Sequence, residues 1–284
     1  MKQNDTYGDN GKQIALFSVL ISVYKKEKPA FLTLALDSVF NQTARAAQVV
    51  LVKDGPLTPE LDSVIDEYCA KYPELDIVPL AENRGLGLAL AEGMLHCKYE
   101  LVARMDSDDI ARNDRFEKQL GIFEKNPSID ICGSHMLEFE DDASNVVTRR
   151  KVPLTDAEIK QYQRRRDGLN HVTVMFKKSS VLKAGNYQHC PLMEDTLLWV
   201  NMFKNGAKAI NIDDYLVNVR IGADMYERRG GWTYFKRYKD ARKKIYQTGY
   251  ISWWDYIYTL IVQAIVALLP NKVRGWLFKS LLHK

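Results

Sequence analysis

The feature that most constrains the fold is a regular alternation of short apolar runs with amphipathic segments, which begins near residue 16. Apolar runs separated by helical patterns predict buried strands of a largely parallel sheet with helices on both faces. The predicted strands are residues 17–23, 48–53, 76–80 and 100–105, and the predicted helices are residues 30–42, 59–72, 87–97 and 113–125. The chain therefore has the outline of an α/β nucleotide-binding half.

The pattern changes after Pro127. Further strands are predicted at residues 129–139, 146–152, 172–177 and 215–221, with a helix at residues 193–205. Because no Pro- or Ser-rich linker divides the chain, we predict one main domain at residues 15–230. A polar extension precedes it at residues 1–14, and a helical tail follows at residues 231–284.

Three carboxylates follow the fourth predicted strand within four residues: Asp106, Asp108 and Asp109. Carboxylates this close repel one another unless a helix start, water or a hard cation such as Mg²⁺ or Mn²⁺ offsets the repulsion. Ligands of open α/β sheets bind at the carboxyl ends of strands. A metal site is therefore one interpretation, and a strand end followed by solvated acids is the other.

Other polar residues are predicted at the same edge of the sheet. Tyr24 follows the first strand and Asp54 follows the second, although Asp54 before a glycine is also a turn signature. The turn at residues 83–88 opens a helix beside Arg84, which suits an anionic ligand. It is not a dinucleotide fingerprint, because Leu90 stands where the third glycine is needed.

The tail differs from the body in charge. Residues 220–284 hold 13 Lys/Arg against 4 Asp/Glu, which leaves 27 against 32 in the rest of the chain. The uncharged stretch at residues 256–269 is shorter than the roughly 20 residues of a spanning helix. Aromatic residues beside basic ones predict a helix lying on an anionic membrane surface. A hairpin packed on the domain is the alternative, and the acidic body argues against a nucleic-acid partner.

The cysteines and the N-terminus indicate the compartment. Four cysteines without C-x-x-C or zinc spacing are read as reduced thiols of a cytosolic protein. The polar, acid-containing start is not typical of a signal peptide. The predicted location is thus cytoplasmic, peripheral on the inner face of a bacterial inner membrane.

Five motifs together resemble glycosyltransferase family 2, the inverting enzymes of the GT-A fold. They are Leu20-Ile-Ser-Val-Tyr24, Val52-Lys-Asp-Gly55, Asn83-Arg-Gly85, Arg104-Met-Asp-Ser-Asp-Asp109 and Glu194-Asp195. The resemblance is strongest to bacterial enzymes that build exopolysaccharide, capsule or O-antigen repeat units, including amylovoran-type galactosyltransferases. It implies a mixed, mostly parallel sheet flanked by helices, followed by the amphipathic helical tail.

The resemblance also implies donor-side roles. Asp108 would hold Mn²⁺ or Mg²⁺, and Asp106 would contact the ribose or the metal. Tyr24 and Asp54 would hold the uracil of a UDP-sugar, with Arg84 and Arg104 near the donor. Two departures concern the contacts to the donor base, because Lys53 stands where an acid is common and Ala91 where asparagine is common.

On the acceptor side the resemblance favours Asp195 as the catalytic base, preceded by Glu194; an ordinary helix-start acid is the alternative. His171 is either an acceptor or metal contact or a structural histidine. Arg228 and Arg229 precede two glycines, and would form a lid over the diphosphate or the start of the basic patch.

The predicted function is transfer of a sugar, galactose or an N-acetylhexosamine, from a UDP-sugar to a lipid-linked, polyprenyl-diphosphate saccharide in polysaccharide biosynthesis. One rival is a non-catalytic membrane-associated scaffold of the same fold. The other is a sugar-nucleotide pyrophosphorylase, which needs a glycine-rich loop after the first strand; residues 24–29 contain no glycine.

Overall fold

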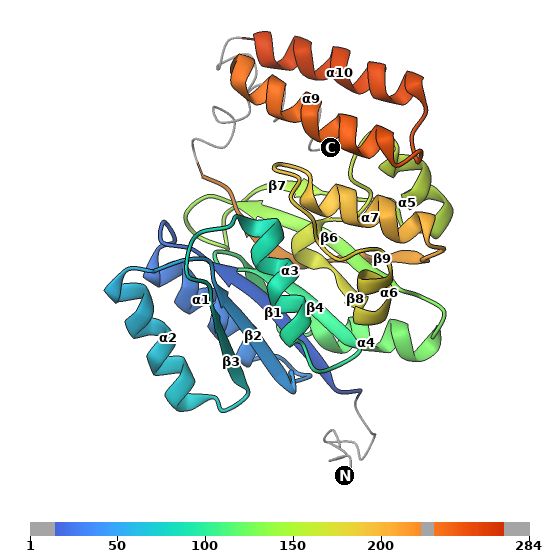
Figure 1. The fold of residues 1–284 in the computed structure, drawn as a ribbon. Helices are drawn as coiled ribbons and strands as arrows, with labels where there is room; N and C mark the ends of the chain where they lie inside the picture. Colours follow the sequence, from blue (N-terminus) through green and yellow to red (C-terminus); the bar gives the residue numbers. More distant parts are fainter. Residues whose placement is uncertain (1–14, 223–229, 270–284) are drawn as a thin grey trace.

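The computed structural model describes residues 15–222 and 230–269 of the 284-residue chain. One large sheet carries helices on both faces, and a helical hairpin stands at one end (Figure 1). The predicted α/β class is confirmed.

The first half alternates strands with helices as predicted, with bounds that match or differ by at most two residues. Its elements are β1 (Phe17–Val23), α1 (Pro29–Phe40), β2 (Gln48–Lys53), α2 (Pro59–Lys71), β3 (Leu75–Pro79), α3 (Leu86–His96) and β4 (Leu101–Asp106). All four strands run parallel. Residues of β1 are buried alternately against two clusters, Val19 and Ile21 on one side of the sheet and Leu20 on the other. Apolar residues stand at successive positions of β1 because both of its faces are covered.

The second half is more irregular. Its elements are β5 (Ile110–Ala111), α4 (Arg115–Lys125), β6 (Ile131–Phe139), β7 (Val146–Arg150), α5 (Asp156–Gln163), η1 (His171–Thr173), β8 (Met175–Lys177), α6 (Lys178–Lys183), α7 (Glu194–Lys204) and β9 (Ala209–Arg220).

The strands of the described chain form one sheet in the order β3-β2-β1-β4-β8-β6-β9-β5, with β7 paired to β6. β8 runs antiparallel to β4 and β6, and β5 runs antiparallel to β9, whereas β6 and β9 are parallel. The sheet is therefore mixed, as the family resemblance implied.

Two strand predictions were wrong in their bounds. The run at residues 172–177 begins as the 3-10 turn η1, because Thr173 Oγ1 and N both donate to the carbonyl of Asn170. β9 starts at Ala209, six residues before the predicted start. Asp213 and Asp214 interrupt the apolar pattern there, but the backbone continues beside β6 through register shifts.

The helix α5 was not predicted, although the sequence carries its start signal. Thr155 and Glu158 form a capping box, in which each side chain bonds to the backbone of the other residue. This helix matters for the site because the segment that follows it, residues 164–170, runs toward α7.

The hairpin comprises α9 (Gly231–Gln247) and α10 (Trp253–Leu268). Ala241, Ile245 and Ile251 pack against Leu197 and Val200 of α7 in one apolar cluster. The hairpin is thus packed on α7 of the main domain. No helix in the described ranges is long and apolar enough to cross a membrane.

Candidate active site

The carboxyl ends of β1, β2 and β4 meet at one edge of the sheet. In the register of these strands Ser22 pairs with Asp106 and Val23 pairs with Lys53. The residues that follow, Tyr24 and Asp54, therefore lie at the same edge as residues 106–109, which we call the acidic segment. Tyr24 is 42% exposed, so its ring is available to a ligand.

Carboxylates of Asp106, Asp108 and Asp109 converge, with one oxygen from each lying within 4.8 Å of the others. Burial, together with the charges of Asp106 and Glu27, raises the pKa of Asp108 to about 7. Burial and the charges of Asp106 and Asp108 also hold the pKa of Asp109 well above its usual range. The cluster therefore stores repulsion that a bound cation would relieve.

A clamp from β9 fixes the acidic segment. The backbone N–H of Arg220 donates to Asp109 Oδ1 over 2.7 Å, and its Nε donates to the carbonyl of Asp108 over 3.3 Å. Its guanidinium also stacks on Phe31, 3.8 Å from the ring centroid. Arg220 was not among the predicted site residues, because a residue 111 positions beyond Asp109 carries no local signal of this contact.

The loop after β1 supplies a further acid that sequence analysis missed. Glu27 Oε2 accepts a 2.7 Å hydrogen bond from Ser107 Oγ, and its charge acts on Asp108. The loop that carries Tyr24 is thereby tied to the acidic segment.

Arg104 lies at the centre of the site, with 1% of its surface exposed. It forms an ion pair with Asp106, and its Nε and Nη1 are buried without a hydrogen-bond partner among the described residues. Burial opposes its charge, but Asp106 and other anionic neighbours still keep the pKa of Arg104 above its usual value. A buried guanidinium with free N–H groups suits an anionic ligand.

Asp54 has a structural task as well. Its carboxylate accepts hydrogen bonds from the N–H groups of Arg84 and Gly85 and from Asn83 Nδ2, at 2.7–3.1 Å. Gly55 has φ +84°, and a Cβ there would lie 2.6 Å from the backbone N of Asn83. The Asp-Gly pair therefore holds the turn that opens α3 against the end of β2. The Arg84 side chain stays about half-exposed.

Glu194 and Asp195 open α7 near Arg104, whose charge acts on both carboxylates. Gly87 permits the close approach of α3, because a Cβ there would lie 3.0 Å from Glu194 Cβ. Burial, then the charges of Asp167 and Glu194, raise the pKa of Asp195 to about 8. A carboxylate with a pKa near neutrality is suited to proton transfer.

Asp167 was not anticipated either. Its carboxylate accepts hydrogen bonds from Thr196 Oγ1 and Gln163 Nε2, which links the end of α5 to the first turn of α7. It is an acidic neighbour of Asp195, supplied by a segment far away in sequence.

His171 faces the domain interior. Its Nε2 lies 2.8 Å from the hydroxyl of Tyr187, and its ring packs edge-on against Trp199. Burial and the charge of Arg104 hold the pKa of His171 well below its usual range, so the imidazole is neutral. Its contacts are those of a structural histidine. Arg228 and Arg229 lie outside the described residues.

The residues fit a hard divalent cation. Carboxylate oxygens are the ligands that Mg²⁺ and Mn²⁺ prefer, and Asp106 and Asp108 are the less buried members of the cluster. Asp109 is buried and already accepts a hydrogen bond from the backbone N–H of Arg220.

An α/β sheet that gathers carboxylates and a buried arginine at its strand ends is the layout of an enzyme acting on a nucleotide diphosphate. The model of glycosyl transferase family 2 matches residues 18–186, and the chain belongs to this family. The predicted family, the GT-A fold and the glycosyltransferase function are confirmed.

Relatives match along almost the whole chain. The amylovoran biosynthesis glycosyltransferase AmsE of Erwinia amylovora is 40% identical over 93% of this chain and 98% of its own. The UDP-Gal:alpha-D-GlcNAc-diphosphoundecaprenol beta-1,3-galactosyltransferase of Escherichia coli is 37% identical over 94% of this chain and 97% of its own.

Solved structures share the fold at low identity. A mannosyltransferase from Pyrobaculum calidifontis, in complex with GDP-Man and Mn²⁺, has a TM-score of 0.63 and 16% identity. The alignment covers 96% of this chain and 75% of that one.

Proposed function

We propose that the chain is a metal-dependent inverting transferase that moves galactose from UDP-galactose to a lipid-linked saccharide at the cytoplasmic face of a bacterial inner membrane. The observation that carries the proposal is that buried Arg104 pairs with Asp106 of the acidic segment at residues 106–109, while its charge also acts on the two acids of α7. Such a site can hold a diphosphate on one side and remove a proton on the other.

On the donor side, Asp106 and Asp108 would hold the cation. The cation would offset the negative charge of the departing diphosphate. The free N–H groups of Arg104 are suited to the same charge. Tyr24 and the turn at Arg84 would contact the nucleotide, since both border the strand ends and are partly exposed.

On the acceptor side, Asp195 would take the proton of the attacking hydroxyl. The acceptor oxygen then bonds to the anomeric carbon as the bond from that carbon to the diphosphate breaks, which inverts the configuration. Galactose as donor sugar and a GlcNAc-diphosphate lipid as acceptor are favoured by the relative from Escherichia coli, whose name states both.

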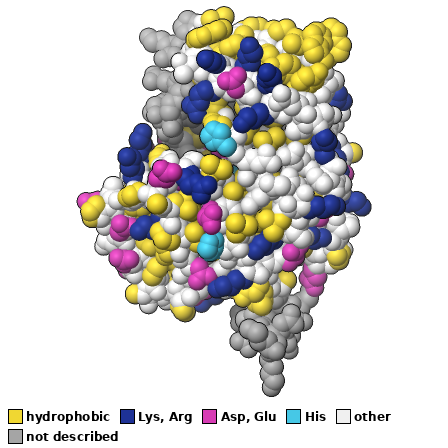
Figure 2. Space-filling model, in the orientation of Figure 1, with side chains coloured by type: hydrophobic (Ala, Val, Ile, Leu, Met, Phe, Trp, Pro, Cys, Tyr) yellow, Lys and Arg dark blue, Asp and Glu magenta, His cyan; other side chains and the backbone are white. Residues whose placement is uncertain are grey.

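The membrane half of the proposal rests on the hairpin. Large apolar side chains stay exposed along α10 at helical spacing: Trp254, Tyr258, Ile261, Ile265 and Leu268. We call this set the α10 stripe. Figure 2 shows apolar side chains gathered over this end of the molecule, with Lys and Arg below them. An apolar stripe beside basic residues is the composition of an interfacial helix, which would keep the enzyme beside a membrane-bound acceptor.

Cations of α9 complement such a surface. Lys236, Arg237, Lys239 and Lys243 are exposed, whereas Arg242 is buried and donates to Thr259 and to the carbonyl of Arg164. One face of α9 therefore fastens the hairpin internally, and the exposed cations remain available to anionic lipid.

The test is UDP release and product formation with a panel of UDP-sugars, with Mn²⁺ or with EDTA, in the presence of GlcNAc-diphosphate-undecaprenol. Product from UDP-galactose that disappears with EDTA is the expected result. Product formation that is indifferent to EDTA would contradict the proposed metal dependence. Absence of product from every donor would contradict the proposed transferase activity.

A further inference from the structure

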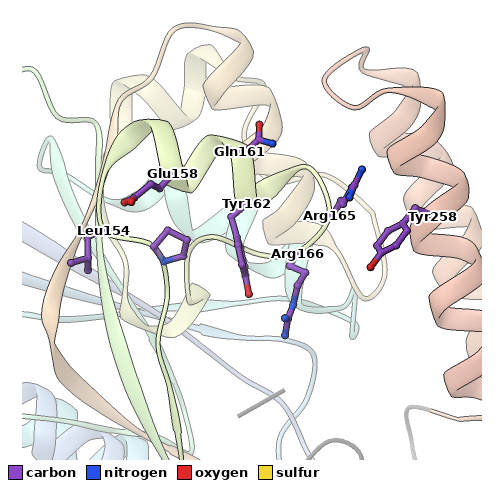
Figure 3. Close-up of a pocket in the computed structure, with 8 residues that line it drawn as sticks. Leu154, Glu158, Gln161, Tyr162, Arg165, Arg166 and Tyr258 are labelled. Carbon is purple, nitrogen blue, oxygen red and sulfur yellow. The ribbon is translucent and has the colours of Figure 1, made fainter. Parts of the chain in front are cut away.

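A cavity of about 640 Å³ lies between α5 and α10, outside the site described above. Figure 3 shows Tyr162 of α5 and Arg166, which follows this helix, on one side of it, with Tyr258 of α10 on the other. Pro153 and Leu154 line its other end. Its size is that of a small-molecule site. Its lining combines aromatic and aliphatic carbon with the guanidinium groups of Arg165 and Arg166, the carboxylate of Glu158 and the amide of Gln161.

The two arginines of the cavity are not equivalent. Arg165 donates to Asp255 Oδ1 over 2.7 Å and stacks on Tyr258, 4.7 Å from the ring centroid. Arg166 stacks on Tyr162 at 5.6 Å and makes no ion pair within residues 15–222 or 230–269. The remaining polar groups of the lining are Glu158, whose carboxylate is engaged by Thr155 in the capping box, and Gln161. The cavity thus offers one cation without an ion pair beside apolar side chains, which suits a ligand with an anionic head and a hydrocarbon chain.

The cavity is continuous with the surface proposed to meet the membrane. Tyr258 both lines the cavity and belongs to the α10 stripe. A hydrocarbon chain leaving the cavity past Tyr258 would therefore run along exposed apolar side chains. The same segment also leads to the chemistry. Asp167 follows Arg166 directly and bonds to Thr196, which adjoins Asp195.

We propose that this cavity binds the diphosphate and the first part of the hydrocarbon chain of the lipid-linked acceptor, with Arg166 pairing with the diphosphate. The proposal rests on the proposed function and deepens it. It assigns the lipid end of the acceptor to the junction of α5 and α10, while the sugar end reaches Asp195.

The experiment compares the wild type, Arg166→Gln and the matched control Arg45→Gln, which removes an exposed positive charge between α1 and β2. Each is assayed with UDP-galactose and two acceptors, GlcNAc-diphosphate-undecaprenol in micelles and a phosphate-free GlcNAc alkyl glycoside. Arg166→Gln is expected to raise KM for the diphosphate acceptor by about tenfold or more, since it removes a charged hydrogen bond. KM for the alkyl glycoside and for the donor should stay unchanged, as should both values in Arg45→Gln.

Direct binding separates this proposal from the proposed function. Undecaprenyl diphosphate without any sugar is titrated into each protein in micelles, and Arg166→Gln is expected to bind it about tenfold more weakly. If the wild type glycosylates neither acceptor, the proposed function fails. The titration still shows whether the cavity binds the diphosphate lipid.

Equal KM changes for the two acceptors, or unchanged binding of the diphosphate lipid, would overturn the proposal. Weaker flotation with phosphatidylglycerol vesicles, together with unchanged diphosphate binding, would assign the cavity to a phospholipid head group and would overturn it as well. Circular dichroism and the thermal transition check that each variant is folded.

Discussion

The acidic segment and the hairpin are held in place in different ways. The acidic segment sits at the end of a central strand and is fixed from several sides, by Arg104 within the strand, by Ser107 through Glu27, and by Arg220 from β9. The hairpin is joined to the domain through one apolar cluster and a few ion pairs, and most of the α10 stripe faces outward. Chemistry requires fixed geometry, whereas a surface for membrane contact requires only an exposed apolar face.

Removing one carboxylate from the acidic segment should have the largest effect. Asp108→Asn is expected to lower kcat/KM by about a thousandfold or more, because the diphosphate loses the cation that offsets its charge. Mn²⁺-dependent UDP release measures this loss, and Asp66→Asn, on the exposed side of α2, is the matched control. Full turnover in Asp108→Asn would leave the acidic segment without a catalytic role.

Substitution of the base comes next. Asp195→Asn is expected to lower kcat by about a hundredfold or more. In the wild type, kcat/KM should rise with pH through about 8, because a base must be deprotonated and the pKa of Asp195 is raised to about 8. The pH profile of the residual activity in Asp195→Asn should lack this rise. A rise that persists in the variant would assign the titration to another group.

On the hairpin, two charges placed on the α10 stripe should separate membrane contact from chemistry. Ile261→Asp with Ile265→Asp is expected to weaken binding to anionic vesicles by about a hundredfold, since each apolar side chain contributes about 1.5–3 kcal/mol on burial. Turnover of a water-soluble acceptor should be unchanged. Leu95→Asp, at an equally exposed position on α3, is the control.

Unchanged flotation of the double variant would mean that something other than lipid covers the stripe. A second copy of the chain would then appear as a dimer in sedimentation that the two aspartates dissociate.

The ion pairs of Asp255 test how the hairpin is fastened. Asp255 is 2% exposed and accepts from Arg164, Arg165 and Ser252. Asp255→Asn is expected to lower the free energy of unfolding by about 1–3 kcal/mol, seen in thermal or urea unfolding.

This difference should depend on pH. Burial opposes ionisation of Asp255, yet its hydrogen bonds hold its pKa below the usual range. The stabilisation is therefore complete above the usual carboxyl pKa of about 4 and is lost as the pH falls toward the lowered value. Wild type and variant should converge in acid. A constant difference down to low pH would point to packing rather than charge.

The smallest expected effect concerns Asp167, which joins the two regions through α5. Its negative charge helps to raise the pKa of Asp195, after burial. Asp167→Asn keeps an oxygen for Thr196 and removes the charge, so the rising limb of kcat/KM should move to lower pH with little loss of maximal rate. An unmoved limb would show that burial and Glu194 set this pKa without Asp167.

Local patterns predicted the parallel core because each strand there is a short, mostly apolar run and each helix repeats with a helical period. The same logic failed at β9, where Asp213 and Asp214 lie inside a strand that is held by its long pairing with β6. It also missed α5, whose capping box is short and whose apolar pattern is weak.

The sequence by itself determined the strand ends, the family and most candidate residues of the site, because a carboxylate after an apolar strand is visible in the chain order. Only the tertiary structure decided which distant groups meet them. Glu27, Arg220 and Asp167 reach the site by contacts between segments remote in sequence. The cavity between α5 and α10 likewise exists only where two separately folded elements approach, since packing, unlike propensity, is a property of pairs of elements.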